Sequence, residues 1–186
     1  MKSTVCCALV TLVLATPLAA MGQQPAGVRD MLRSMTSDHA THTAFTFDHD
    51  MLQSAIGFLN DGSGPPLHLN SVTVENYRYN EQAFYLPESM QALVHAYDAA
   101  GWKHLVDQNA SPAESASPTK TLTDLWLHFH GADINDVTVL VRGARQMSVI
   151  EVTGEFRPLD LVHLSGHLGI PKVDPNAVMV PAPAGK

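Results

Sequence analysis

Three side chains near the C-terminal end of the chain have types and a spacing that could bind a metal ion. If residues 158–168 form a helix turning 100° per residue, Asp160, His163 and His167 fall within a stripe of about 60°. One carboxylate and two imidazoles can ligate zinc. The alternative is that this stripe is the polar side of a helix whose buried side carries Leu161, Leu164 and Leu168. The pattern marks a candidate zinc site that packing alone also explains.

A second pair of histidines could act as metal ligands from a predicted strand. His128 and His130 are two residues apart, so they project from the same side of a strand over residues 122–130. Trp126 shares that side, and the alternative is a partly covered surface. A looser acidic and histidine-rich group at residues 38–50 is explained by a solvated connector. Ten histidines are the one unusual feature of the composition, so zinc is the only cofactor that the sequence suggests.

Motifs for catalysis are absent from the sequence. It has no H-E-x-x-H pair, no G-x-S-x-G turn, no P-loop and no dinucleotide fingerprint. Residues 117–120 match S-x-x-K, but they lie in a Ser/Pro loop instead of at a helix start. Glu75, Glu151 and Glu155 could form an acid-base pair only if the fold brings two of them together. We therefore expect no enzyme, and an unrecognised hydrolase is an alternative.

The apolar pattern predicts the elements that would position these side chains. Asp48 is a good N-cap for one helix, and Pro87 suits the first turn of another that ends at Gly101. Alternation of β-branched and aromatic residues indicates strands. The expected order is helix 28–35, connector 36–47, helix 48–59, strand 67–79, helix 87–100, strand 102–106, mobile loop 109–120, strands 122–130, 137–141 and 147–153, and helix 158–168.

The expected fold class is α+β, a single mostly antiparallel sheet of about five strands with helices packed on one face. Short connections between the strands after residue 122 imply antiparallel pairing. In the strand 122–130, alternate residues should face opposite sides, with Leu125, Leu127 and Phe129 on one side and Asp124, Trp126 and His128 on the other. Gly154 is expected to end the last strand, over residues 147–153.

The N-terminal residues are typical of a secretory signal peptide. Lys2 precedes an apolar run of about 14 residues, which is short of the roughly 20 that span a bilayer. Cleavage after Ala20 or Gly22 would fit, and an uncleaved anchor is the alternative. The two cysteines, Cys6 and Cys7, both lie inside this segment, so the mature chain would have no thiol chemistry. We expect a periplasmic or secreted protein with no transmembrane helix after cleavage.

The charge of the chain limits the classes of partner that it can bind. The net charge is −7 and basic residues are not clustered, so the chain lacks the electrostatic signature of nucleic-acid binding. We expect a signal peptide at residues 1–20, a lead-in at 21–46 with a short helix, one α+β domain at 47–173, and a disordered tail at 174–186.

Five segments in order resemble a bacterial exported family called domain of unknown function 4252: VTVENYRY, GWKHLV, LTDLWLHFHG, VTVLVRGARQMSVIEVTGEF and PLDLVHLSGHLGIPKV. The resemblance covers roughly residues 47–173, and the last segment is its most specific part. The chain departs from the family in its Ser/Ala/Pro loop at 109–120 and in its histidines. The resemblance implies an exported α+β domain, and genes of this family often neighbour sigma-factor and anti-sigma-factor genes, which suggests envelope signalling. It implies no catalytic residues.

Together these patterns favour a non-enzymatic binding or signalling accessory module of the bacterial cell envelope. Its partner would be an envelope protein or a small ligand. The alternatives are a histidine-based metal-binding protein and a hydrolase with an unrecognised acid-base pair.

Overall fold

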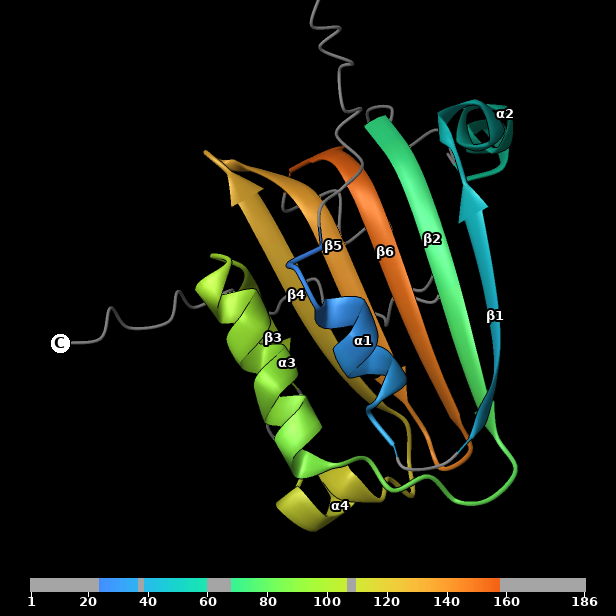
Figure 1. Cartoon of the computed structure of the whole chain (residues 1–186). Helices are drawn as coiled ribbons and strands as arrows, with labels where there is room; N and C mark the ends of the chain where they lie inside the picture. Colours follow the sequence, from blue (N-terminus) through green and yellow to red (C-terminus); the bar gives the residue numbers. More distant parts are fainter. Residues whose placement is uncertain (1–23, 37–38, 60–67, 107–109, 158–186) are drawn as a thin grey trace, which may run out of the picture.

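The computed structural model describes residues 24–36, 39–59, 68–106 and 110–157. Their main feature is one antiparallel six-stranded sheet in the order β1-β2-β6-β5-β4-β3, accompanied by a few helices (Figure 1). The predicted α+β class is therefore confirmed, with one strand more than expected. The elements are α1 Val28–Arg33, β1 Ala40–Phe47, α2 His49–Leu59, β2 His68–Tyr79, α3 Pro87–Ala99, β3 Lys103–Val106, α4 Pro112–Ala116, β4 Leu122–His130, β5 Asp133–Arg142 and β6 Gln146–Phe156.

The additional strand is β1, and the prediction of a connector over residues 36–47 is wrong for most of that segment. β1 pairs with β2 along its whole length, from Ala40 opposite Tyr79 to Phe47 opposite Val72. Seven of its eight residues are exposed because it lies at the edge of the sheet. An edge strand exposed on both sides needs no apolar face, which is why its sequence looks like a polar connector.

β6 also extends further than expected, because Gly154 does not end it. The strand continues to Phe156, with Gly154 buried and paired opposite Leu69 of β2. The pairing of β2 with β6 shifts between Leu69 and Ser71, so the glycine lies beside an irregularity in the ladder. A glycine within a strand often marks such a site.

Helices α1 and α3 lie across one face of the sheet, which we call the helix face (Figure 1). Tyr97 of α3 stacks on Trp126 of β4 with ring centroids 4.7 Å apart, and it meets Trp102 edge-on at 5.0 Å. Trp126, which one reading of the sequence placed on a partly covered surface, is fully buried here. This aromatic cluster is the centre of the larger apolar core.

The opposite face of the sheet, which we call the groove face, carries the alternate residues of the same strands. Leu125, Leu127 and Phe129 of β4 belong to this side, which confirms the predicted alternation of β4. They belong to a second apolar cluster with Val72, Val137, Val139, Ile150 and Val152 of the neighbouring strands. Leu52 of α2 is also part of this cluster, so the helices do not all pack on one face as the sequence predicted.

The caps of the two longer helices form as the sequence predicts. Asp48 precedes α2, and its Oδ1 accepts a hydrogen bond from the Met51 backbone N–H at 3.0 Å. Pro87 is the first residue of α3. Gly101 follows that helix with a φ of +83°, a conformation that glycine adopts without strain.

The Ser/Ala/Pro segment contains a short helix, so the prediction of a mobile loop over 109–120 is wrong for part of it. α4 begins after Ser111, whose hydroxyl accepts a hydrogen bond from the Glu114 N–H. Arg142 of β5 donates to the Ser115 carbonyl at 2.7 Å, and the Ala116 carbonyl accepts from the Tyr85 N–H. These contacts bind α4 to the end of the sheet. The predicted signal peptide, the C-terminal helix and the tail lie outside the described residues.

Candidate functional site

The predicted zinc ligands are not brought together among the described residues. Asp160, His163 and His167 lie outside the described part of the chain. His128 Nδ1 lies 3.3 Å from Asp136 Oδ2, and its ring stacks on Trp102 at 5.1 Å, while His130 is exposed at the end of β4. Between residues 24 and 157, as far as the structure describes them, no three His, Cys, Asp or Glu side chains group as a metal site would require.

The fold does bring two of the three strand carboxylates onto the same face. Glu75 of β2 is paired with Val149, and Glu151 of β6 is paired with Thr73, so the two glutamates are diagonal neighbours on the helix face. Their side chains are only 11% and 13% exposed. Each carboxylate interacts with different polar groups.

Glu75 accepts hydrogen bonds from the side chains beside it. The Tyr77 hydroxyl donates to Glu75 Oε2 at 2.8 Å, and His42 Nε2 lies 2.9 Å from the same oxygen. The rings of His42 and Tyr77 stack at 4.5 Å. Burial, followed by the hydrogen bond to Glu75, raises the pKa of the Tyr77 hydroxyl well above its usual range. Tyr77 is therefore a fixed hydrogen-bond donor at physiological pH.

Glu151 has a raised pKa of about 6, against its ordinary value of 4.5. Burial is the main cause, and the negative charge of Glu75 adds to it. Arg29 of α1 opposes the rise, but its Nη2 lies 3.9 Å from Glu151 Oε2 and its side chain is mostly exposed. The other oxygen, Oε1, is buried and has no hydrogen-bond partner within the described residues. Glu151 is thus a carboxyl that loses its proton only as the pH rises through about 6.

Glu75 and Glu151 are of the residue type that acid-base catalysis uses, but both side chains are largely buried. Two carboxyl groups side by side in different surroundings are the arrangement with which one site can hold both an acid and a base. A reacting group would have to reach Glu151 beneath α1, and Oε1 has almost no accessible surface. The pair is consequently better suited to proton binding within the fold than to turnover.

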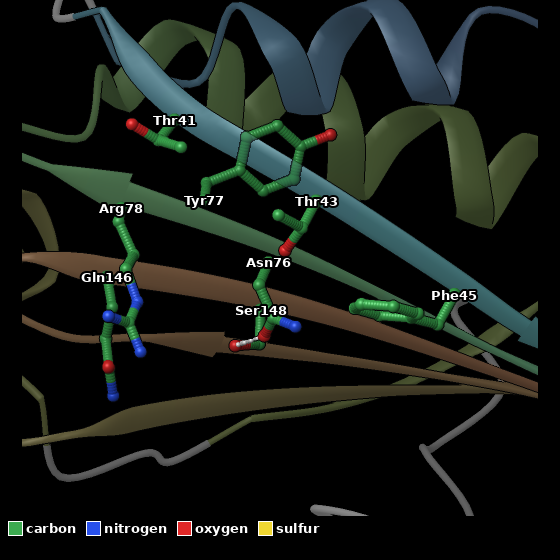
Figure 2. A pocket seen from close by; sticks show the side chains of 8 residues that line it. All are labelled: Thr41, Thr43, Phe45, Asn76, Tyr77, Arg78, Gln146 and Ser148. Carbon is green, nitrogen blue, oxygen red and sulfur yellow. Dashed lines mark hydrogen bonds between the residues drawn. The ribbon is translucent and has the colours of Figure 1, made fainter.

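An open groove lies on the other side of the sheet, away from α1 and α3 (Figure 2). It has a volume of about 460 Å³, within the range of roughly 300–1,000 Å³ found for small-molecule sites. Strands β1, β2 and β6 form it, because their register places alternate residues of all three side by side. The lining residues are Thr41, Thr43, Phe45, Asn76, Tyr77, Arg78, Gln146 and Ser148. Tyr77 is the exception to the alternation, because its side chain lies with Glu75 on the helix face.

The groove presents hydrogen-bonding groups, one cation and one aromatic ring. Ser148 donates to Asn76 Oδ1 at 2.8 Å, which orients that amide (Figure 2). Arg78 is exposed and makes no ion pair with any residue that the structure describes. Phe45 is 61% exposed, the most exposed of the large apolar side chains described. The exposed guanidinium and the uncovered aromatic ring are both groups that a ligand in this groove could contact.

Sequence reasoning did not find this groove. Three of its lining residues belong to the segment read as a connector, and the others look like ordinary strand positions. One signal was present: the alternation of threonine and phenylalanine in THTAFTF, from Thr41 to Phe47, is typical of a strand. Without the pairing register, however, Arg78 and Phe45 could not be assigned to one surface.

Comparison of the chain with family models, with curated proteins and with solved structures gives no match. Within the described residues, none of the helices has the length and apolar character needed to cross a membrane. Functional inference therefore depends on the geometry of the groove and of the carboxylate pair.

Proposed function

We propose that this protein is a non-enzymatic binding module of the bacterial cell envelope, periplasmic or secreted, whose groove holds a small anionic ligand. The single observation that carries the proposal is Arg78, which is exposed in an open groove lined by hydroxyl and amide groups and has no ion-pair partner among the described residues. The signal-peptide pattern and the resemblance to an exported envelope family support the location.

The chemistry of the groove favours a hydroxyl-rich carboxylate. A guanidinium binds a carboxylate through two parallel hydrogen bonds, which a lysine cannot reproduce. Thr41, Thr43 and Gln146 offer further donors and acceptors. The exposed face of Phe45 can contact the apolar side of a ring. A sugar acid combines a carboxylate, several hydroxyl groups and a ring with an apolar side.

Calorimetry or NMR titration with galacturonate tests this proposal, with glucose as the neutral probe. We expect galacturonate to bind with a dissociation constant on the order of 1 mM, since the groove is open, and glucose to bind more weakly. Arg78→Gln should weaken galacturonate binding by about tenfold or more, because a hydrogen bond to a charged group is lost.

The matched control is Arg145→Gln, which removes the same charge from an exposed position on the β5–β6 turn, outside the groove. It should leave the affinity within about twofold. Equal weakening by both substitutions would reduce the effect to net charge and contradict the proposal. Binding of glucose as tightly as galacturonate would contradict the role of Arg78.

The metal-binding alternative depends on residues outside the described part of the chain. His128 already has Asp136 and Trp102 as neighbours, so a zinc site would have to be built mainly from Asp160, His163 and His167. Calorimetry with zinc and copper tests this, and binding no tighter than about 1 mM would exclude it. The hydrolase alternative would use Glu75 and Glu151, and Glu151→Gln would then abolish turnover.

A further inference from the structure

β1 is exposed along nearly its whole length. β1 is the first strand in the sheet order, and its residues from Thr41 to Phe47 are all exposed. Phe45 and Phe47, which share the groove face, are 61% and 41% exposed. Among the residues that the structure describes, β2 is the only strand that pairs with β1.

The backbone register shows which groups point outward from this edge. The Tyr79 N–H bonds to the Arg145 carbonyl on the β6 side. Since successive residues of an antiparallel strand alternate in the direction of their backbone groups, Asn76 and Arg78 bond toward β1, where they are paired with Thr43 and Thr41. The intervening residues of β1 therefore direct their N–H and C=O groups away from the sheet: His42, Ala44 and Thr46.

β1 carries none of the features that prevent edge strands from pairing. Such strands are usually protected by lysine, proline, a bulge or an inward-pointing charge. Residues 40–47, ATHTAFTF, contain no lysine, proline or carboxylate, and the pairing with β2 has no register shift. The only titratable side chain, His42, contacts Glu75 of its own chain. Within the part of the chain that the structure describes, nothing on this strand opposes pairing with a further strand.

We propose that two copies of this chain associate through antiparallel pairing of β1 with β1, on a two-fold axis at Ala44. This register overlaps the complete exposed strand. Ala44 lies opposite Ala44 of the second copy, and His42 lies opposite Thr46, so the outward backbone groups bond to each other. The two six-stranded sheets become one continuous sheet.

The strand is complementary to itself in this register, which is why we assign a second copy as the partner. On the groove face, Thr43 lies opposite Phe45 of the second copy and Thr41 opposite its Phe47. Threonine and phenylalanine are favourable cross-strand neighbours. No carboxylates oppose each other, although the chain as a whole has a net charge of −7.

Dimerisation would complete the groove. Thr41, Thr43 and Phe45 line one side of it, and the second copy would bring its own Phe45 and Phe47 to the same surface. The two grooves would merge across the axis into one long, aromatic-lined channel. The assembly itself does not depend on the ligand, so its test is independent of the galacturonate titration.

Disulfide trapping tests the register in the full chain carrying Cys6→Ser and Cys7→Ser. Ala44→Cys should form an interchain disulfide on mild oxidation, because hydrogen-bonded partners lie about 5.5 Å apart between Cα atoms. Thr46→Cys is the matched control, equally exposed and on the same strand. Two copies of residue 46 would lie roughly 13 Å apart, too far for a disulfide.

Sedimentation of the wild-type chain and of Ala44→Pro provides the second measurement. The proline removes an outward N–H and no bond to β2, so the monomer should keep its fold by circular dichroism and lose the dimer. We expect wild-type protein at twice the monomer mass and Ala44→Pro at the monomer mass. A monomeric wild type, a dimer that persists in Ala44→Pro, or equal trapping of both cysteines would overturn the proposal. If Ala44→Pro does not fold, the proposal is tested by the disulfide yield of Ala44→Cys relative to that of Thr46→Cys.

Discussion

Arg78 and Glu151 lie on neighbouring strands but on opposite faces of the sheet, and their surroundings give them different roles. Arg78 is exposed, faces the groove and has no ion-pair partner among the described residues. Glu151 is 13% exposed beneath α1, next to a second carboxylate. The first is suited to a soluble anion, and the second to a proton. Successive side chains of a strand point to opposite faces of the sheet. The anion-binding group and the proton-binding group therefore lie on opposite sides.

At the scale of single residues, we predict that Glu151 makes folding stability depend on pH. Its pKa is higher in the folded state, about 6, than its ordinary value of 4.5. The folded protein therefore binds this proton more tightly, and the resulting stabilisation is complete below about pH 4.5 and lost as the pH rises through 6. A difference of 1.5 units corresponds to a loss on the order of 2 kcal/mol.

Glu151→Gln should remove most of this loss and stabilise the protein at pH 8 by up to about 2 kcal/mol, since it replaces a buried charge with a neutral group. Urea unfolding at pH 4.5 and pH 8 measures the effect. Glu155→Gln, on the same strand but exposed, is the control and should change neither value by more than about 0.5 kcal/mol. An unchanged pH dependence in Glu151→Gln would show that another group is responsible.

At the scale of elements, the buried pair of Arg142 and Asp124 connects β5, β4 and α4. Arg142 Nη2 donates to Asp124 Oδ2 at 2.9 Å, and both side chains are about 95% buried. Nη1 donates to the Ser115 carbonyl, which explains why a Ser/Ala/Pro segment is an ordered helix. His104 Nε2 lies 3.2 Å from the other oxygen of Asp124.

Breaking this pair should be costly and should release α4. Arg142→Met leaves Asp124 buried without its main partner, and we expect a loss of about 3–5 kcal/mol. Hydrogen exchange at residues 112–117 should accelerate more than exchange in β5. The double substitution Asp124→Leu with Arg142→Met should cost less than Arg142→Met alone, because no uncompensated charge remains. A larger loss in the double variant would argue against a burial penalty.

Sequence alone predicted those elements that bury a face or carry a cap. The strands β2 and β4 and the helices α2 and α3 follow from alternation, Asp48 and Pro87. β1 was missed because an edge strand exposed on both faces has no apolar stripe, and α4 because its order depends on Arg142, which is distant in the sequence. Similarly, the groove exists only through the pairing of three strands. Glu75 and Glu151 were identified as carboxylates, but not their proximity.

At the scale of the whole molecule, the sheet has one face covered by α1 and α3 (Figure 1). The other face presents the groove near the exposed edge strand β1. In the proposed dimer, these grooves join across the two-fold axis. Ligand binding and association would then reinforce each other, because Phe45 both lines the groove and lies in the proposed interface. We predict that saturating galacturonate shifts the monomer–dimer equilibrium toward the dimer, measured by sedimentation at several protein concentrations. A shift toward the monomer would indicate that ligand and second copy compete for β1.

The most direct measurement of the central claim is an NMR titration of the uniformly ¹⁵N-labelled protein with galacturonate. We predict that the amides with the largest shift changes belong to the groove, in β1, β2 and β6, including Thr43, Asn76, Arg78 and Ser148. The same titration of Arg78→Gln should produce changes at least several times smaller at equal ligand concentration. Shift changes centred on α1 and α3, or none at tens of millimolar ligand in the wild type, would contradict the assignment of the groove as the binding site.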